Sequence, residues 1–424
     1  MRRVELAYGR TGLSLDLEAQ ADVIEPRYLP GLVDEPSAIR QALRAPTSGP
    51  PLSALVPRGG SVGISVCDVT RPFPGRRVLP ILLDELRSSR AGPITIFIAT
   101  GTHRACTPRE LDSMLGPGVL SACAVLQHDA FDAARHCRVG TLLGTSTPAL
   151  VEAQFLDQDV RLTTGFIEPH FFAGFSGGPK MVAPGLAAIE TVLDLHSAAR
   201  IADPCATWGV TLGNPVHDAV RAIAETVGVA FNLDVTLNRD HQVTNVFSGE
   251  LFASHAVGCA FARQTAMAPV DNTYDVVVTT NSGYPLDQNL YQTVKGMSAA
   301  AQIVKPGGSI VVASQCSDGL PAHGGYAELL LKGKDPNTFL AQLVSPGFSV
   351  HDQWQVQVQA QIQRKARVFV KADGLTAEQL RAAWFEPVDD LAACVDERLR
   401  VAAGPGARLA VLPQGPQTIP YVRS

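Results

Sequence analysis

The segment HFFAGFSGGPK, residues 170–180, places a histidine and a lysine at the two ends of a glycine-rich loop. A glycine-rich loop with a lysine can hold a phosphate, but the P-loop pattern GxxxxGK[ST] is not met, because this lysine follows a proline and precedes a methionine. Gly177 and Gly178 are better explained as positions where the backbone approaches something flat or bulky. His170 is a candidate base and Lys180 a candidate amine, while the three phenylalanines between them are either core residues or part of a binding wall.

Two further segments carry polar side chains directly after apolar runs. In DVTRP, Asp68 and Thr70 offer oxygen atoms, and Arg71 offers a rigid guanidinium that suits a carboxylate or a phosphate. In TGTHR, His103 can act as a general base or as a metal ligand. The alternatives are a capping aspartate beside a surface arginine, and a histidine with a purely structural place in a strand-end loop.

Two helical segments hold the remaining candidates. His196 follows the apolar pattern of AAIETVLDL, and a lone histidine on a helix is either structural or a ligand. In YQTVK, Tyr291 and Lys295 are four residues apart and share one helix face, with Gln292 beside them. A phenol, an amide and an ammonium grouped in this way could hold a small carboxylate or a hydroxyl. The alternative is a solvated helix face.

Alternating strands and helices are expected to position the residues of the first part of the chain. Apolar, β-branched runs at 61–68 and 94–103 are separated by a helix-like segment at 76–90, which predicts parallel strands buried on both faces. Another strand is expected at 160–168, directly before His170. Because ligands bind beyond the carboxyl ends of parallel strands, the polar residues at these three strand ends are expected to meet at one site.

The sequence after this site predicts two helices and a hairpin. The helices are expected at 186–200 and at 214–228, the second with Asn214 as its N-cap and Pro215 as its first residue. The hairpin is expected at 231–249, where the apolar and polar residues alternate around an Asn-Arg-Asp turn. These elements complete the first predicted domain.

A second α/β unit follows. A strand within 274–285, a helix at about 287–304 and a strand at 309–314 form a βαβ unit, and the same alternation continues to the end of the chain. The 424 residues exceed the roughly 250–300 at which one core stops growing. We therefore predict two α/β domains, 1–265 and 266–424, with a cofactor and a substrate in the cleft between them.

The composition is that of a folded protein whose partners are small molecules. It is 46% hydrophobic and 18% charged, and the formal net charge of -5 gives no electrostatic reason to expect nucleic acid or an anionic membrane. The first residues lack the apolar core of a signal peptide and no apolar stretch has the length of a membrane helix, so a cytoplasmic protein is expected. The eight scattered cysteines include no CxxC pair, which predicts reduced thiols.

Taken together, DVTRP, GTHR, HFFAGFSGGPK, His196 and YQTVKG resemble, in order and spacing, the motif set of the nickel-dependent lactate racemase family. That family uses a nickel-pincer nucleotide, a pyridinium mononucleotide whose two sulfur-bearing arms and ring carbon hold nickel. The resemblance implies a covalent link between this cofactor and Lys180. It also implies that His196 is a nickel ligand, a role that imidazole suits. Further cofactor contacts are implied for Asp68, Val69, Thr70, Arg71, Gly177 and Gly178.

The resemblance also implies a mechanism and assigns the acid/base roles to His103 and His170. One histidine takes the hydroxyl proton of a 2-hydroxy acid while the hydrogen on C2 leaves as hydride, which gives a 2-keto acid. Return of the hydride to the other face, with a proton from the second histidine, inverts the stereocentre. A hydride acceptor is needed because the C2–H bond is too weakly acidic for a lone histidine to deprotonate easily. Substrate-binding roles are implied for Arg71, Tyr291, Gln292, Lys295 and Trp354.

The expected activity is racemisation of lactate or of a longer aliphatic or aromatic 2-hydroxy acid; the loop phenylalanines favour an apolar side chain slightly. Malate racemisation and C2 epimerisation of sugar acids are alternatives on the same scaffold. A metal-dependent lyase or hydrolase that uses His103, His170 and His196 directly as ligands stays open, as does a non-catalytic hydroxyacid-binding protein. The expected partners are the small-molecule substrate and the enzymes that make the cofactor.

Overall fold

The computed structural model describes residues 2–321, 324–345, 347–402 and 406–423. The chain forms two compact units, each of which we describe by itself. The N-terminal unit comprises Tyr28–His196 and Asp203–Arg263, and the C-terminal unit comprises Met1–Arg27, Ser197–Ala202 and Gln264–Ser424. The predicted α/β class with two domains is confirmed.

The units divide the chain differently from the predicted ranges, 1–265 and 266–424, because the first 27 residues fall in the C-terminal unit. Strand β3 (Ala21–Val23) pairs with β19 (Leu409–Leu412) at the edge of the C-terminal sheet. The hairpin of β1 (Arg2–Leu6) and β2 (Leu13–Leu17) packs its apolar side chains into the core of the same unit. The chain ends therefore meet in one core, and local sequence patterns carry no signal for such a long-range contact.

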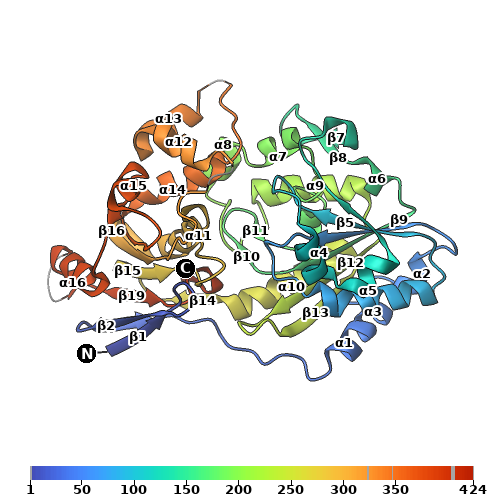
Figure 1. Ribbon diagram of the computed structural model, residues 1–424, viewed down its shortest axis with the longest axis horizontal. Helices are drawn as coiled ribbons and strands as arrows, with labels where there is room; N and C mark the ends of the chain where they lie inside the picture. Colours follow the sequence, from blue (N-terminus) through green and yellow to red (C-terminus); the bar gives the residue numbers. More distant parts are fainter. Residues whose placement is uncertain (1, 322–323, 346, 403–405, 424) are drawn as a thin grey trace. The chain divides into compact units, whose positions relative to one another are not determined.

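The N-terminal unit is built on a six-stranded sheet with the order β13-β12-β9-β4-β5-β6 (Figure 1). Only the β12–β13 pair is antiparallel. The hairpin expected at 231–249 and the strands expected within 61–68, 94–103 and 160–168 are all present. The strands are β4 (Val62–Cys67), β5 (Ile94–Ala99), β6 (Ala124–Gln127), β9 (Val160–Phe166), β12 (Phe231–Leu237) and β13 (Val243–Gly249).

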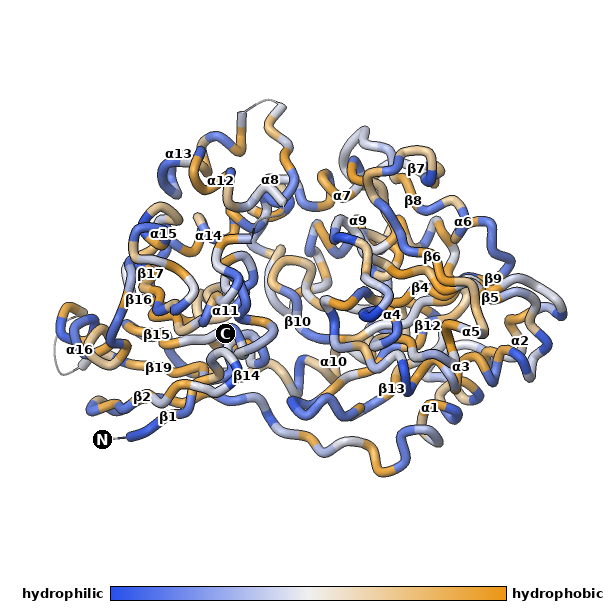
Figure 2. The backbone as a smooth tube through the Cα atoms, viewed as in Figure 1, coloured by the Kyte–Doolittle hydropathy of each residue, from blue (hydrophilic) through white to orange (hydrophobic). Residues whose placement is uncertain are grey.

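The centre of this sheet is a topological switch point. From β4 the chain adds β5 and β6 on one side, and it later returns to place β9, β12 and β13 on the other. All six residues of β4 are buried, as expected for a central parallel strand. Hydrophobic residues colour β4 and its neighbours orange in Figure 2. The carboxyl ends of β4 and β9 therefore open on the place where α/β sheets bind their ligands.

Helices, a small hairpin and short loops complete the N-terminal unit. The hairpin consists of β7 (His136–Thr141) and β8 (Pro148–Glu152), and β10 (Pro169–His170) pairs with β11 (Gly174–Phe175). The helices are α1 (Glu35–Arg44), α2 (Leu52–Leu55), α3 (Gly75–Ser88), α4 (Pro108–Leu115), α5 (Pro117–Ala122), α6 (Ala153–Leu156), α7 (Ile189–Leu195), α9 (Pro215–Val227) and α10 (Leu251–Ala266), with 3-10 turns η1 (Ala133–Arg135) and η2 (Gly178–Met181).

The C-terminal unit contains a parallel six-stranded sheet with the order β18-β17-β16-β15-β19-β3 (Figure 1). The predicted βαβ unit is confirmed as β15 (Tyr274–Thr280), α11 (Leu290–Ala301) and β16 (Val304–Ala313), although β16 begins five residues before the strand expected at 309–314. The other strands are β14 (Met267–Val270), β17 (Arg367–Lys371), β18 (Glu386–Pro387) and β20 (Ile419–Val422). The other helices are α8 (Ala198–Ala202), α12 (Tyr326–Gly333), α13 (Pro336–Leu343), α14 (Gln353–Lys365), α15 (Ala377–Ala382) and α16 (Leu391–Val401), with the 3-10 turn η4 (Gly415–Gln417).

One predicted helix is interrupted. The segment 186–200 was expected to be continuous, but α7 ends at Leu195 and α8 begins at Ala198. His196 is the C-cap residue of α7, with a backbone conformation outside the helical region. It therefore lies at the end of a helix and not on a helix face.

None of the helices in the described part of the chain is long and apolar enough to cross a membrane.

Asn214 connects α9 to the glycine-rich loop. Its side-chain oxygen accepts hydrogen bonds from the backbone N–H groups of Val216 and His217, as an N-cap does, and its amide donates to the carbonyls of Phe172 and Val210 at 3.0 and 2.9 Å. The residue is fully buried. One side chain thus caps a helix and holds the loop that carries the candidate residues.

We expect Asn214→Ala to lower the free energy of unfolding by about 2–4 kcal/mol, because it removes a cap and the side-chain donor to the buried carbonyl of Phe172 and the half-buried carbonyl of Val210. Asp34→Ala is the matched control: Asp34 caps α1 at an exposed position, so its loss should cost only about 1 kcal/mol. Urea denaturation of both variants measures the difference. Equal losses would contradict the additional role of Asn214.

Candidate active site

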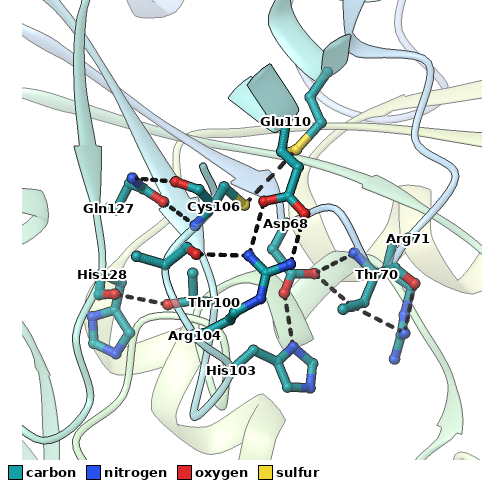
Figure 3. Close-up of polar contacts among 12 residues, drawn as sticks. Asp68, Thr70, Arg71, Thr100, His103, Arg104, Cys106, Glu110, Gln127 and His128 are labelled. Carbon is teal, nitrogen blue, oxygen red and sulfur yellow. Dashed lines mark hydrogen bonds and ion pairs between the residues drawn. The ribbon is translucent and has the colours of Figure 1, made fainter. Parts of the chain in front are cut away.

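The carboxyl ends of β4 and β5 bring Asp68 and His103 together, as predicted. Nδ1 of His103 lies 2.7 Å from Oδ2 of Asp68, and the Thr70 hydroxyl donates to Oδ1 of the same carboxylate at 2.6 Å (Figure 3). Since a carboxylate only accepts, Nδ1 carries the hydrogen, and a neutral His103 presents the lone pair of Nε2. The His103 side chain is 48% exposed, so this basic nitrogen belongs to a ring that solvent and small molecules can reach.

Asp68 is ionised and held in place by its neighbours. Burial alone would raise its pKa, but the hydrogen bonds from His103 and Thr70 and the charge of Arg71 outweigh this, so the pKa lies below its usual value. A buried carboxylate with this environment fixes the orientation of the histidine and stabilises a positive charge on it.

Arg71 and Val69 lie on the exposed side of the same loop. The guanidinium of Arg71 donates to the carbonyl of Thr70 at 3.2 Å, and its Nε is 3.9 Å from a carboxylate oxygen of Glu168. The side chain of Val69 is largely exposed. In Figure 3, His103 and Arg71 lie on different sides of Asp68. The structure thus brings the DVTRP and TGTHR candidates into one polar cluster.

His170 lies at the start of the glycine-rich loop and is buried among its aromatic neighbours. The N–H of Ala173 donates to Nδ1 of His170 at 3.3 Å, so in the neutral ring Nε2 carries the hydrogen. The imidazole packs against Phe171 and Phe172, with ring centroids 5.0 and 4.6 Å away. All three loop phenylalanines are buried, and Phe175 also lines a cavity beside the loop.

Lys180 and His196 both lie beside Phe172. The ring of His196 meets that of Phe172 edge to face at 5.1 Å, and Nζ of Lys180 is 6.0 Å from the centre of the same ring. Nδ1 of His196 donates to the carbonyl of Val192 at 2.8 Å, which leaves the lone pair on Nε2. A histidine whose tautomer is fixed by a backbone carbonyl is the usual form of a metal ligand.

The two glycines before Lys180 are required by close packing against protein. Gly178 has φ +51°, and a Cβ at this position would lie 2.4 Å from Cγ of His255 on α10. Its N–H donates to Oδ2 of Asp234 at 3.0 Å, and a Cβ on Gly177 would lie 3.1 Å from Oδ1 of the same carboxylate. The close backbone approach was predicted, and the groups approached here are a helix and a buried aspartate.

A cavity of about 230 Å³ lies next to this loop and was not predicted. Its wall includes His217 and Arg221 on α9, and His255 and Arg263 on α10. Burial, together with nearby positive charges that include Lys180 and Arg221, lowers the pKa of both histidines to about 4, so they are neutral at pH 7. None of the described residues that line it is acidic, and the cavity favours a negatively charged group. The spacing of four residues between His217 and Arg221, and of eight between His255 and Arg263, could have indicated that each pair shares one helix face.

Apart from Arg71, which lies in the N-terminal unit, the predicted substrate-binding residues belong to the C-terminal unit. Tyr291, Gln292 and Lys295 lie in the first half of α11, which begins at the carboxyl edge of the sheet, and the N–H of Gln292 donates to the N-cap Asn289 at 3.1 Å. Trp354 lies on α14 and is only 5% exposed. Helix α14 contacts α11, where the Gln355 side chain donates to the carbonyl of Tyr291.

The fold and the site define a two-unit α/β protein with an aspartate-held histidine at the switch point of its first sheet. Residues 8–209 match the lactate racemase N-terminal domain, and residues 270–419 match the lactate racemase C-terminal domain. The chain belongs to the lactate racemase family, as its motifs predicted. It is an enzyme, an isomerase of the racemase class.

Similar proteins span nearly the whole chain. The lactate racemase of Thermoanaerobacterium thermosaccharolyticum is 32% identical over 432 residues, with 99% of each chain covered. The lactate racemase of Lactiplantibacillus plantarum is 33% identical over 389 residues, with 90% of each covered. The structure of the lactate racemase apoprotein from T. thermosaccharolyticum superposes with a TM-score of 0.93 at 31% identity, with both chains fully covered. A Thermotoga maritima protein at 18% identity and TM-score 0.71, covering 93% of this chain and 100% of its own, shares the fold.

Asp234 gives the glycine-rich loop a predictable response to pH. It is fully buried on β12, and burial raises its pKa to about 7, although hydrogen bonds from Asn232 and Gly178 oppose the shift. Between about pH 4 and pH 7 the folded chain therefore holds a proton that the unfolded chain has lost, and stability falls as pH rises.

We expect Asp234→Asn to become more stable relative to the wild type as the pH rises through this window, by up to about 1.4 kcal/mol per pH unit. Denaturant unfolding at several pH values measures the difference. Asp240→Asn, the same change at an exposed position of the β12–β13 turn, is the control. Stability profiles of wild type and Asp234→Asn that stay parallel from pH 4 to pH 7 would contradict the assignment.

Proposed function

We propose that this chain racemises a 2-hydroxy acid, first of all lactate, with a nickel-pincer nucleotide held by its N-terminal unit. The observation that carries the proposal is the arrangement of its three histidines. His103 is held by a buried carboxylate, His170 lies at the next strand end, and His196 shares the Phe172 ring with Lys180. The names of the two relatives support lactate as the substrate.

The residues present fit the proposed cofactor. His196 offers an imidazole lone pair to nickel, and Lys180 offers an amine for the covalent link. The cavity lined by Phe175 of the glycine-rich loop and by Arg221 and Arg263 has the positive character that the phosphate of a nucleotide requires. When bound, the cofactor accepts the C2 hydrogen of the substrate as hydride and returns it to either face.

The two acid/base histidines begin in complementary states. His103 presents an Nε2 lone pair and can take the proton of the 2-hydroxyl group, while Asp68 stabilises the imidazolium that forms. His170 carries its hydrogen on Nε2 and can give a proton to the carbonyl oxygen of the 2-keto acid. A racemase runs in both directions, so the two histidines exchange roles for the opposite enantiomer.

The substrate carboxylate is assigned to positively charged and amide side chains. Lys295 and Arg71 supply the charge and Gln292 a hydrogen-bond donor, while Tyr291 and Trp354 complete the proposed set. The loop phenylalanines are buried in the N-terminal unit, and the slight preference for an apolar side chain that was inferred from them stays a prediction. The cytoplasmic location and the cofactor-making enzymes as partners stay predictions.

A lyase or hydrolase with metal bound directly by His103, His170 and His196 is disfavoured. Among the described residues, these three histidines do not form a group with ligand atoms close enough to share an ion. The Phe172 ring also contacts both His170 and His196. A non-catalytic hydroxyacid-binding protein would have no need for a base held by a buried carboxylate.

The covalent link is tested by co-producing the chain with the enzymes that make the cofactor, followed by intact mass and incubation with single enantiomers of lactate. The wild type should carry the cofactor mass and racemise lactate, and Lys180→Ala should lose both. Lys332→Ala, a highly exposed lysine, is the control and should keep both. A wild-type chain without added mass and without racemisation of lactate, a longer aliphatic or an aromatic 2-hydroxy acid would refute the proposal.

The role of the Asp68–His103 pair is tested by Asp68→Asn. An asparagine keeps the shape but cannot hold the same tautomer, so racemisation should slow by about 100- to 10,000-fold while the cofactor mass and the fold are retained. Asp240→Asn should keep full activity. A rate for Asp68→Asn within about threefold of the wild type would show that His103 does not need its carboxylate.

A further inference from the structure

A second cluster of ligand-forming side chains, none of them assigned a role above, lies in the N-terminal unit. His128 follows β6, His136 begins β7 and Glu152 ends β8. One ligand atom from each residue lies within 4.8 Å of the others. Asp132 and Arg135 belong to the same connection between β6 and β7. Neither the motifs nor the acid/base chemistry of the proposed racemase uses this cluster.

His136 contributes a buried nitrogen with a lone pair. Its Nδ1 lies 2.9 Å from the carbonyl oxygen of Asp132, which can only accept, so Nδ1 carries the hydrogen. The lone pair is therefore on Nε2. That atom is buried and has no hydrogen-bond partner among the described residues. A buried nitrogen without a partner costs free energy unless another group completes it.

His128 and Glu152 also contribute a lone pair and a buried oxygen to the cluster. Nε2 of His128 lies 3.1 Å from the carbonyl oxygen of Ala187 and donates to it, so in the neutral ring the lone pair of Nδ1 faces Oε2 of Glu152 at 3.3 Å. Both side chains are fully buried. Oε1 of Glu152 is also buried and has no hydrogen-bond partner in the described part of the chain. Two lone pairs that face each other require a proton or a cation between them.

Arg135 satisfies this requirement only in part. Its guanidinium lies 2.8 Å from Oε2 of Glu152, with 23% of its side chain exposed. A proton on His128 would complete the same oxygen. Among the described residues, neither arrangement provides a partner for the buried Oε1 of Glu152 or for the buried Nε2 of His136.

We propose that His128, His136 and Glu152 bind a divalent metal ion of the zinc type, at a site separate from the cofactor nickel. Two imidazoles and a carboxylate are a ligand set that Zn²⁺ accepts, with water in the fourth position, whereas Ca²⁺ and Mg²⁺ prefer oxygen ligands alone. Zinc bonds of about 2.0–2.1 Å place tetrahedral ligands about 3.3–3.4 Å apart. Small side-chain rotations bring the atoms to this spacing, and the partly exposed Arg135 withdraws from Oε2.

The ion would stabilise the segment that leads into α7. The N–H of Glu152 donates to the carbonyl of Leu186, and the N–H of Ile189 donates to that of Ala130, both at 2.9 Å. The loop after β6, strand β8 and the start of α7 are thus already bonded to one another around the cluster. Because α7 ends at His196, a metal that tightens this junction would also fix the position of that histidine.

The test uses the full chain, produced without the cofactor-making enzymes and treated with EDTA. Zinc affinity is measured by competition with a chromogenic chelator, and Co²⁺ is used as a spectroscopic probe of the ligands. The wild type should bind one Zn²⁺ tightly and unfold at a higher temperature with zinc than without it. His136→Ala and Glu152→Gln should weaken binding by at least about 100-fold, since the loss of an outer partner alone costs about 10- to 100-fold.

Three further variants distinguish a metal site at this cluster from zinc bound elsewhere on the chain and from a polar network without metal. His196→Ala removes the proposed nickel ligand, and His241→Ala removes an exposed histidine; both should bind zinc as the wild type does. Arg135→Gln removes the competing cation and should bind zinc more tightly, a result that a purely structural polar network does not predict. If Glu152→Gln fails to fold, His136→Ala at a less buried position decides the question.

The proposal is overturned if the wild type takes up neither Zn²⁺ nor Co²⁺, or if His136→Ala binds zinc with wild-type affinity. It is also overturned if His196→Ala, and not His136→Ala, abolishes binding, since the ion would then belong to the cofactor site. Zinc binding is measured on the chain without the cofactor, whereas racemisation is measured with the cofactor present. The two proposals can therefore fail independently.

Discussion

The hydrogen bond between the buried carboxylate of Asp234 and the N–H of Gly178 is the constraint on which the candidate site depends. It fixes the glycine-rich loop to the central sheet at a point where no side chain fits, because a Cβ on Gly178 would overlap His255. The loop begins at His170 and ends at Lys180, so both residues take their positions from this contact. Burial of the ionised carboxyl group costs free energy, and the hydrogen bonds from Asn232 and Gly178 offset part of that cost.

The chemistry of the three histidines follows from what binds each Nδ1. A carboxylate holds His103, a backbone N–H holds His170 and a backbone carbonyl holds His196. These different partners leave a lone pair on Nε2 of His103 and of His196 and a hydrogen on Nε2 of His170, which are the states that the proposed base, metal ligand and acid require. The partners that decide these states are mostly backbone atoms.

Local patterns predicted the parts of the fold that depend on neighbouring residues. Strand ends at Asp68 and His103 and the Asn214 cap were predictable, because alternation, β-branched runs and capping residues report local structure. Helix α14 was not, since the alternating sequence WQVQVQAQIQ has the period of a strand. It is a helix buried on all sides, in which Gln355, Gln357 and Gln359 donate to backbone carbonyls of other segments.

For the candidate site, too, the sequence predicted what local order and spacing report and missed what depends on the fold. Its motif residues were predicted because a family resemblance could be read from order and spacing, and the structure places the Asp68, His103 and Lys180 groups in one unit. The buried Asp234 and the cluster around Glu152 were missed, because the groups that contact them come from segments that only the folded chain brings together. Phe172 illustrates the difference between the sequence and the fold. In the sequence it is only an apolar residue in a loop. In the fold its ring contacts His170 and His196 and lies beside Lys180, so the spacing of three polar groups is set by one apolar side chain.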